Sequence, residues 1–222
     1  MWRALLVAGV LLMSPVPWPA WPKIADQVLL EAPIERQRPE LDNGCEVVSL
    51  SMLLRHAGKP VGRLKLAEEV AKDRTELRMD AQGRILYWGD PHRGFVGDIT
   101  GLRKGYGVYH RPLFELLDRH LPGRARDLTG GDFERVLQSV TAGRPVVVWT
   151  TSMFDQTKQW VTWNSPSGPI YATFHEHAVL LVGYTAHTVT VNDPLDGKRK
   201  TVDRTRFYRS WEMMGRQAVT YE

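Results

Sequence analysis

The order of hydrophobic patterns along the chain limits the fold more than any other feature. Apolar residues recur at helical spacing in the first two thirds, and glycine or proline stands at several of the segment ends. The predicted helices cover residues 45–57, 64–72, 112–120 and 131–142, with a further one over 203–214. From residue 145 the pattern becomes β-prone with turn residues between segments, which predicts strands over 145–150, 159–163, 170–174, 177–182, 188–193 and 217–221. Helices first and an antiparallel sheet second predict an α+β domain.

Residues 78–111 interrupt this pattern. They are rich in glycine and aromatic residues and lack a periodic apolar spacing. We therefore expect a long, ordered loop region there.

The first residues have the features of a targeting segment. A short basic start, Met1 to Arg3, precedes a nearly uninterrupted apolar run from Ala4 to Met13, and prolines then break any helix. These are the parts of a secretory signal, and the run is too short to span a bilayer comfortably. We expect residues 1–22 to be a signal peptide or an uncleaved N-terminal membrane anchor, which places the rest of the protein outside the cytoplasm.

The remaining length suits one domain. Residues 23–31 read as a linker and residues 32–222 as the domain, which we expect to be a monomer. The net charge is +4, but the basic residues are spread along the chain and no nucleic-acid motif is present. We therefore expect a solvated basic surface and no nucleic-acid partner.

The chain has one cysteine, Cys45. One cysteine cannot form an internal disulfide, and an inert buried thiol is the commonest fate of such a residue. Cys45, however, follows Asn43-Gly44 and opens an apolar helix. Free N–H groups and the positive end of the helix dipole at that position lower the pKa of a thiol, so we expect a reactive cysteine.

A thiolate nucleophile needs an imidazole to carry the proton to the leaving group. Among the seven histidines, His177 lies at the start of a buried β-prone segment, which would hold it rigidly. If residues 183–187 form a hairpin loop, Val182 pairs with Thr188 and His177 lies directly opposite Asp193 on one face of the sheet. Asp193 would then orient the imidazole, with the amide of Asn192 as the alternative.

These segments resemble a known family. The stretch QRPELDNGCEVVSLSMLL, from Gln37 onward, closely resembles the start of the bacteriocin-processing (double-glycine leader) peptidase-like family, in particular its exported stand-alone members. The segments GFVGD at 94–98, GYGVY at 105–109, HAV at 177–179 and NDP at 192–194 match later parts of the family in order. The resemblance covers roughly residues 32 to 215.

The resemblance implies a papain-like cysteine peptidase fold and a triad of Cys45, His177 and Asp193. It also implies that Gln37 donates to the oxyanion together with the backbone N–H of Cys45. We expect an exported cysteine hydrolase that cleaves a peptide or amide bond, with a peptide or a cell-wall peptide as substrate and with no cofactor. Members that process bacteriocin leaders are usually fused to a transporter, so leader processing does not follow for this chain.

Two other functions stay open at this point. His175 and His177 alternate along one segment and could bind zinc together with Asp193, which would make the protein a metal hydrolase. Alternatively, a papain-like scaffold could hold a peptide or a wall component without catalysis. Metal analysis and thiol labelling distinguish these possibilities from a cysteine hydrolase.

Overall fold

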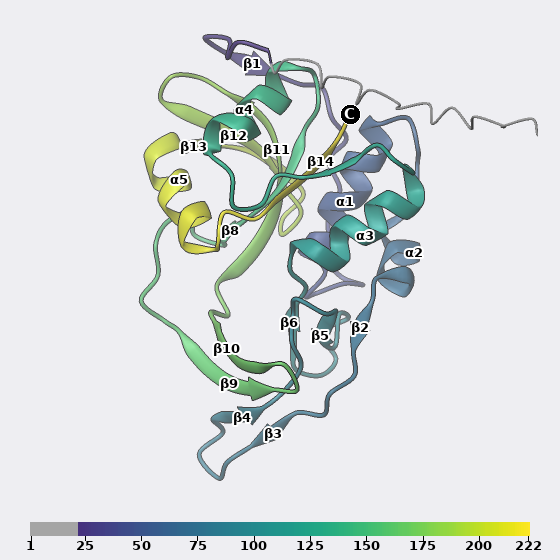
Figure 1. Ribbon diagram of the computed structural model, residues 1–222, viewed down its shortest axis with the longest axis vertical. Coiled ribbons are helices and arrows are strands. Elements are labelled where there is room, and N and C mark those ends of the chain that lie inside the picture. The colour runs from purple at the N-terminus through teal and green to yellow at the C-terminus, as the bar shows by residue number, and fades with distance from the viewer. Residues whose placement is uncertain (1–21) are drawn as a thin grey trace, which may run out of the picture.

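The structure is a computed structural model that describes residues 22–222 (Figure 1). The expected signal or anchor, residues 1–22, lies almost wholly outside the described residues. The helices are α1 Cys45–His56, α2 Arg63–Glu69, α3 His110–His120, α4 Phe133–Thr141 and α5 Arg204–Met213. The strands are β1 Val28–Leu29, β2 Lys72–Asp73, β3 Arg78–Met79, β4 Ile85–Tyr87, β5 Phe95–Gly97, β6 Gly105–Gly107, β7 Ala125–Asp127, β8 Val146–Thr151, β9 Val161–Ser165, β10 Gly168–Ala172, β11 Glu176–Tyr184, β12 Thr188–Asp193, β13 Lys198–Asp203 and β14 Ala218–Tyr221.

The main sheet has the strand order β13-β12-β11-β8-β14-β7, and β1 adds to it by pairing with β11. All of these pairings are antiparallel. The predicted α+β class, with helices ahead of an antiparallel sheet, is confirmed. The central strand of this sheet, β11, begins at Glu176, so His177 is its second residue.

Side chains alternate across β11 and divide the core into two layers. Ala178, Leu180 and Val182 belong to the apolar cluster that includes α1 and α3, whereas Val179 and Leu181 belong to the cluster that includes α4 and α5. This alternation follows from the two-residue period of a strand. Figure 1 shows the result: α1 and α3 lie on one side of the main sheet, and α5 lies on the other.

Helix α1 is buried on every side. Ten of its twelve residues, from Cys45 to Leu54, are buried, so it is a central helix. It packs against β11, β8, α2 and α3. Because such a helix has little freedom to move, the residues at its N-terminus have fixed positions.

The region 78–111 contains more regular structure than we predicted. Strands β3, β4, β5 and β6 lie within it, in two small sheets whose strand orders are β10-β9-β4-β3 and β2-β5-β6. Each of the four strands has only two or three residues, which is too short to leave an alternating pattern in the sequence.

The predicted boundaries differ from the structure by a few residues. Helix α3 begins at His110, two residues before Pro112, where we expected it to begin. The first turn of a helix tolerates a proline, because an N–H group at that position has no acceptor within the helix. Strands β7 and β13 were not predicted. Strand β1 lies inside the expected linker 23–31, and it pairs with Gly183 and Tyr184 of the main sheet.

Within residues 22–222, no helix combines the length and the apolar character that crossing a bilayer requires.

Candidate active site

The approach to α1 is fixed by two residues ahead of Cys45. Asn43 donates its side-chain N–H to the carbonyl of Asp98, and the N-cap residue Gly44 makes no side-chain cap. A Cβ on Gly44 would lie 2.7 Å from the Cβ of Leu41. Leu41 packs against this position, which therefore requires a residue without a side chain.

Two residues of α1 hold the helix against β11 at a single point. The backbone N–H of Ala178 donates to Sγ of Cys45 at 3.4 Å, and Oγ of Ser49 donates to the carbonyl of Ala178 at 3.2 Å. Cys45 and Ser49 are four residues apart and therefore share a helix face. The sulfur is thus held beside the backbone of the residue that follows His177.

The thiol of Cys45 lies 3.4 Å from Oε2 of Glu46 and is only 6% exposed. Burial, together with the negative charges of Glu46 and Glu176, raises the pKa of the Cys45 thiol well above its ordinary value. Our prediction of a lowered pKa is therefore wrong for this arrangement. The helix N-terminus is present, but burial of the thiol and the two nearby carboxyl groups outweigh it.

His177 and Asp193 lie in direct contact. Nε2 of His177 and Oδ1 of Asp193 are 2.7 Å apart, and both side chains are almost fully buried. Burial opposes ionisation of Asp193, but the hydrogen bond and charge of His177 hold the pKa of this carboxyl well below its ordinary value. An ionised carboxylate only accepts hydrogen bonds, so Nε2 carries the hydrogen and Nδ1 has the lone pair in the neutral ring.

Asp193 is also held by two further donors. The backbone N–H of Leu195 donates to its Oδ1 at 2.9 Å, and Nζ of Lys200 on β13 donates to its Oδ2 at 2.7 Å. Lys200 also contacts Asp196. These contacts fix the carboxylate and compensate part of its charge.

The strand register differs from the one we assumed. Leu180 pairs with Asn192 and Leu181 with Val191, with an irregularity before Gly183. Continuing that register places Asp193 opposite Val179 rather than His177. The error is two residues, and because side chains alternate with period two, His177 and Asp193 still share a face. The alternative orienting residue, Asn192, instead donates to the carbonyls of Ala32 and Pro33.

Gln37 is buried close to both halves of the site. Its backbone N–H donates to the carbonyl of Pro194, directly after Asp193, and its Nε2 donates to the carbonyl of Asp42 at 2.6 Å. Its Oε1 is buried without a hydrogen-bond partner among the described residues. An amide nitrogen has two hydrogens, so Nε2 keeps a second donor.

The structure therefore brings the four predicted residues into one region and joins two of them directly. His177 and Asp193 are hydrogen-bonded, and Cys45 touches the backbone next to His177. In the part of the chain that the structure describes, the partners of the thiol are Glu46 and Ala178, and the imidazole is not among them. The ring of His177 packs near Phe154, on the α5 side of the sheet.

The zinc site that we considered does not form. Strand β11 begins at Glu176, so His175 lies before it, and Nε2 of His175 contacts Oε1 of Gln159 at 3.0 Å. Among residues 22–222, the ligand-type atoms that gather within 4.8 Å belong to Cys45, Glu46 and Glu176. Within this group the thiol of Cys45 contacts Glu46, and the backbone N–H of Val108 donates to Oε1 of Glu46 at 2.6 Å.

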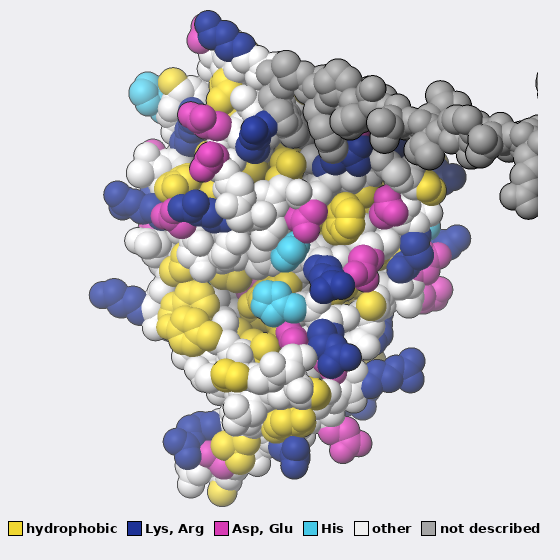
Figure 2. All heavy atoms as spheres, viewed as in Figure 1, with side chains coloured by type: hydrophobic (Ala, Val, Ile, Leu, Met, Phe, Trp, Pro, Cys, Tyr) yellow, Lys and Arg dark blue, Asp and Glu magenta, His cyan; other side chains and the backbone are white. Residues whose placement is uncertain are grey.

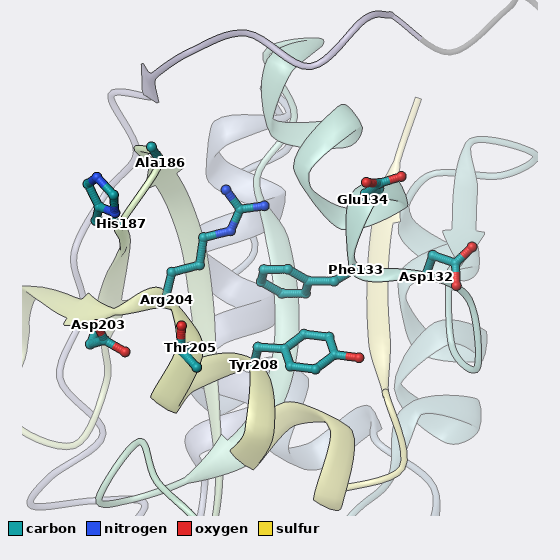
Figure 3. Close-up of a pocket in the computed structure, with 9 residues that line it drawn as sticks. All are labelled: Asp132, Phe133, Glu134, Ala186, His187, Asp203, Arg204, Thr205 and Tyr208. Atoms are coloured by element: carbon teal, nitrogen blue, oxygen red, sulfur yellow. The ribbon is translucent and has the colours of Figure 1, made fainter.

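A large hollow lies elsewhere in the described residues. It has a volume of about 600 Å³ and is open to solvent between the start of α4, the β11–β12 turn and the start of α5 (Figure 3). Figure 3 shows the Arg204 side chain extending across it, with the rings of Phe133 and Tyr208 alongside. None of the four predicted site residues lines it, so size alone does not identify the active site.

Sequence reasoning missed the residues that surround the predicted triad. Glu46 and Glu176 adjoin Cys45 and His177 in the chain, so their position next to predicted site residues was a usable signal. Lys200 and Ser49 left no such signal in the sequence. Lys200 reaches Asp193 through the pairing of strands in the sheet, and Ser49 reaches Ala178 because it shares a helix face with Cys45.

Comparisons with known proteins identify the family of this chain. Residues 29–219 match the model of the Peptidase_C39 like family. The protein YvpB of Bacillus subtilis (strain 168), described as uncharacterized, is 40% identical over 184 residues, which is 83% of this chain and 71% of YvpB. A crystal structure from Bacillus anthracis, described as a "putative C39-like peptidase", superposes with a TM-score of 0.81 at 41% identity, over 89% of this chain and 98% of that one. The family match, a relative that is similar over most of its length and a shared fold together mean that the chain belongs to the Peptidase_C39 like family.

Proposed function

We propose that this protein cleaves a peptide or amide bond, with Cys45 as nucleophile, His177 as general base and acid, and Asp193 as the residue that orients His177. The observation that carries the proposal is the buried His177–Asp193 hydrogen bond, one residue from the backbone N–H that contacts the Cys45 sulfur. Membership of a C39-like peptidase family supports the same chemistry.

The tautomer of His177 suits the role of base. With the hydrogen on Nε2 directed to Asp193, the lone pair of Nδ1 can take the thiol proton. The thiol hydrogen of Cys45 is directed to Glu46 in this structure, so the sulfur must first turn from Glu46 toward Nδ1. The triad is thus assembled by a side-chain rotation at a fixed helix end.

The reaction is then acyl transfer. Sγ of Cys45 attacks the carbonyl carbon as its proton passes to Nδ1 of His177, and the resulting oxyanion accepts hydrogen bonds from Gln37 Nε2 and the Cys45 backbone N–H. The imidazolium protonates the leaving amine as the C–N bond breaks. Water then gives a proton to Nδ1 and attacks the thioester, the C–S bond breaks, and the sulfur recovers the proton.

The experiment is a comparison of the purified protein with its Cys45→Ala variant on a peptide library and on cell-wall peptide fragments. We expect hydrolysis by the natural protein and none by Cys45→Ala. Equal activity of both on a substrate would disprove the proposal. A Cys45→Ser variant serves as a near-isosteric control for the fold of the site.

A second function has an observation in its favour. The raised pKa and low exposure of Cys45 suit a protein that holds a peptide without cleaving it. If natural protein and Cys45→Ala bind the same peptide equally and cleave none, this binding function is correct and the hydrolase proposal is wrong.

We also propose where the protein acts. The apolar run from Ala4 to Met13 supports export to the cell surface or the medium. The absence of a nucleic-acid partner is proposed as well, since acidic and basic side chains are interspersed on the face in Figure 2. Fractionation of cells and a reporter fused to residues 1–22 test the export.

A further inference from the structure

The residue that follows the nucleophile is an acid with no exposure to solvent. Glu46 is 0% exposed, its Oε1 accepts the backbone N–H of Val108 at 2.6 Å, and its Oε2 contacts Sγ of Cys45 at 3.4 Å. A carboxylate taken out of water needs strong partners or a proton. Backbone N–H groups and one thiol are weak compensation for burial, so Glu46 is a poor site for a negative charge.

A second acid faces the same space from the sheet. Glu176 opens β11 on the α1 side, and its Oε1 is buried without a hydrogen-bond partner among the described residues. A Cβ placed on Gly107 would lie 2.4 Å from Oε1 of Glu46 and 3.1 Å from Oε2 of Glu176. The two carboxyl groups therefore converge on Gly107, the glycine that ends β6.

Three acidic groups in so small a volume cannot all ionise. Atoms of Cys45, Glu46 and Glu176 lie within 4.8 Å of one another. Burial raises the pKa of Glu46 to about 7, and burial with the charge of Glu46 raises the pKa of Glu176 well above its ordinary value. Near neutral pH the two carboxyl groups therefore hold a proton between them, as closely spaced carboxyl pairs do.

The surroundings leave that proton in place. Tyr106 and Tyr109, whose hydroxyl groups are 2.6 Å apart, face the carboxyl groups, and burial raises the pKa of both, so they stay neutral. Asp90 adds a negative charge near Tyr109. On the other face of β11, Lys200 is engaged by Asp193 and Asp196.

We propose that Glu46, paired with Glu176, is the positioning residue that sets the protonation state of Cys45. This inference rests on the proposed function of Cys45 as nucleophile. When Glu46 carries the proton, its O–H donates to the sulfur and stabilises the thiolate. When Glu46 is ionised, it accepts the S–H hydrogen and holds the sulfur as a thiol turned away from His177. The nucleophile is thus available while the pair keeps its proton and is withheld once the pair loses it.

The variant Glu46→Gln tests this with little change in shape. The amide Oε1 can still accept the Val108 N–H, which leaves Nε2 facing Sγ as a permanent donor without charge. The readout is the rate of alkylation by iodoacetamide in the full-length protein, measured from about pH 5 to about pH 9. Because the chain has one cysteine, every alkyl group incorporated reports on Cys45.

We expect Glu46→Gln to be alkylated roughly 10- to 100-fold faster than the natural protein at about pH 8, because removing a like charge in contact shifts a pKa by about 1–2 units. The difference should shrink toward about pH 5, where Glu46 is protonated in the natural protein as well. Glu176→Gln should show a smaller change in the same direction, and it keeps the test possible if Glu46→Gln does not fold.

The matched control is Glu115→Gln, at an exposed position of α3 that pairs with Arg111. It should leave the alkylation profile unchanged. Coincident profiles for the natural protein, Glu46→Gln and Glu176→Gln, with thermal unfolding showing that all are folded, would overturn the proposal. Alkylation does not require hydrolysis, so this result is independent of whether any substrate is cleaved.

Discussion

Ser49 and Ala178 join the central helix to the strand that carries His177: Oγ of Ser49 donates to the carbonyl oxygen of Ala178 at 3.2 Å. The N–H of the same Ala178 donates to Sγ of Cys45. Both polar groups of one strand residue are therefore bound by one helix face. Because the helix end and the strand start are fixed to each other there, the distance between sulfur and imidazole depends on this contact.

We expect Ser49→Ala to lower both stability and catalysis. It leaves a buried carbonyl without its donor, which costs about 1–3 kcal/mol of unfolding free energy. It also loosens the helix end, so kcat should fall by more than the unfolded fraction explains. Urea unfolding and peptide hydrolysis measure the two effects.

The control for this variant is Ser139→Ala. Ser139 is also fully buried and hydrogen-bonded, to the carbonyl of Arg144 and to Thr220, but it lies in α4. It should cost similar stability and leave kcat unchanged. If the two variants lose the same fraction of activity, the Ser49–Ala178 contact has no positioning role.

Replacing Asp193 by asparagine should lower kcat/KM by about 10²- to 10⁴-fold, the usual contribution of general acid–base catalysis. In the natural protein both oxygens of Asp193 accept hydrogen bonds, from His177 and Leu195 on one and from Lys200 on the other. An amide has one oxygen and one N–H₂ group, so it must face either His177 or Lys200 with a donor. Steady-state hydrolysis of a peptide substrate measures the loss.

Asp196→Asn is the matched control, because Asp196 also contacts Lys200, at 3.1 Å, without touching His177. It should retain kcat/KM within about threefold, as expected for a partly exposed ion pair. If the Asp193→Asn variant is as active as Asp196→Asn, Asp193 has no role in the mechanism.

We expect Gln37→Ala to lower kcat and kcat/KM by the same factor, about 10²- to 10³-fold, because an oxyanion donor acts only in the transition state. Gln37 also anchors the loop before Cys45 through the carbonyl of Asp42, so thermal unfolding must be followed alongside. A rise in KM at constant kcat would show that Gln37 binds substrate rather than the oxyanion.

The architecture could be predicted from the sequence because its large elements have strong periodic patterns. Val146 to Thr151 and Cys45 to Leu54 are both continuously buried, and both appear as largely apolar runs with turn residues near their ends. Strands such as β5 and β6 could not be predicted. They have three residues each, and their pairing depends on partners far away in the chain.

The members of the candidate site could be named, but their environment could not. His177 and Asp193 meet despite a register error of two residues, since that error preserves the face of the sheet. The pKa of Cys45 was predicted in the wrong direction because it depends first on burial of the thiol and then on the charges of Glu46 and Glu176, and both the burial and the approach of Glu176 come from the packing of β11 against α1. A helix N-terminus is visible in a sequence, whereas a charge brought in by tertiary packing is not.

The buried carboxyl group of Glu46 should also make stability depend on pH. Burial raises its pKa from 4.5 to about 7, so its contribution to stability is complete below about pH 4.5 and is lost as the pH rises through about 7. A pKa rise of that size corresponds to roughly 3 kcal/mol. Glu46→Gln cannot ionise, so its unfolding free energy relative to the natural protein should increase between about pH 5 and about pH 8 by up to that amount. Urea unfolding at both pH values measures the gap, with the exposed Glu115→Gln variant as the reference. A gap that stays constant over this range would mean that Glu46 is ionised throughout and that no proton is held beside Cys45.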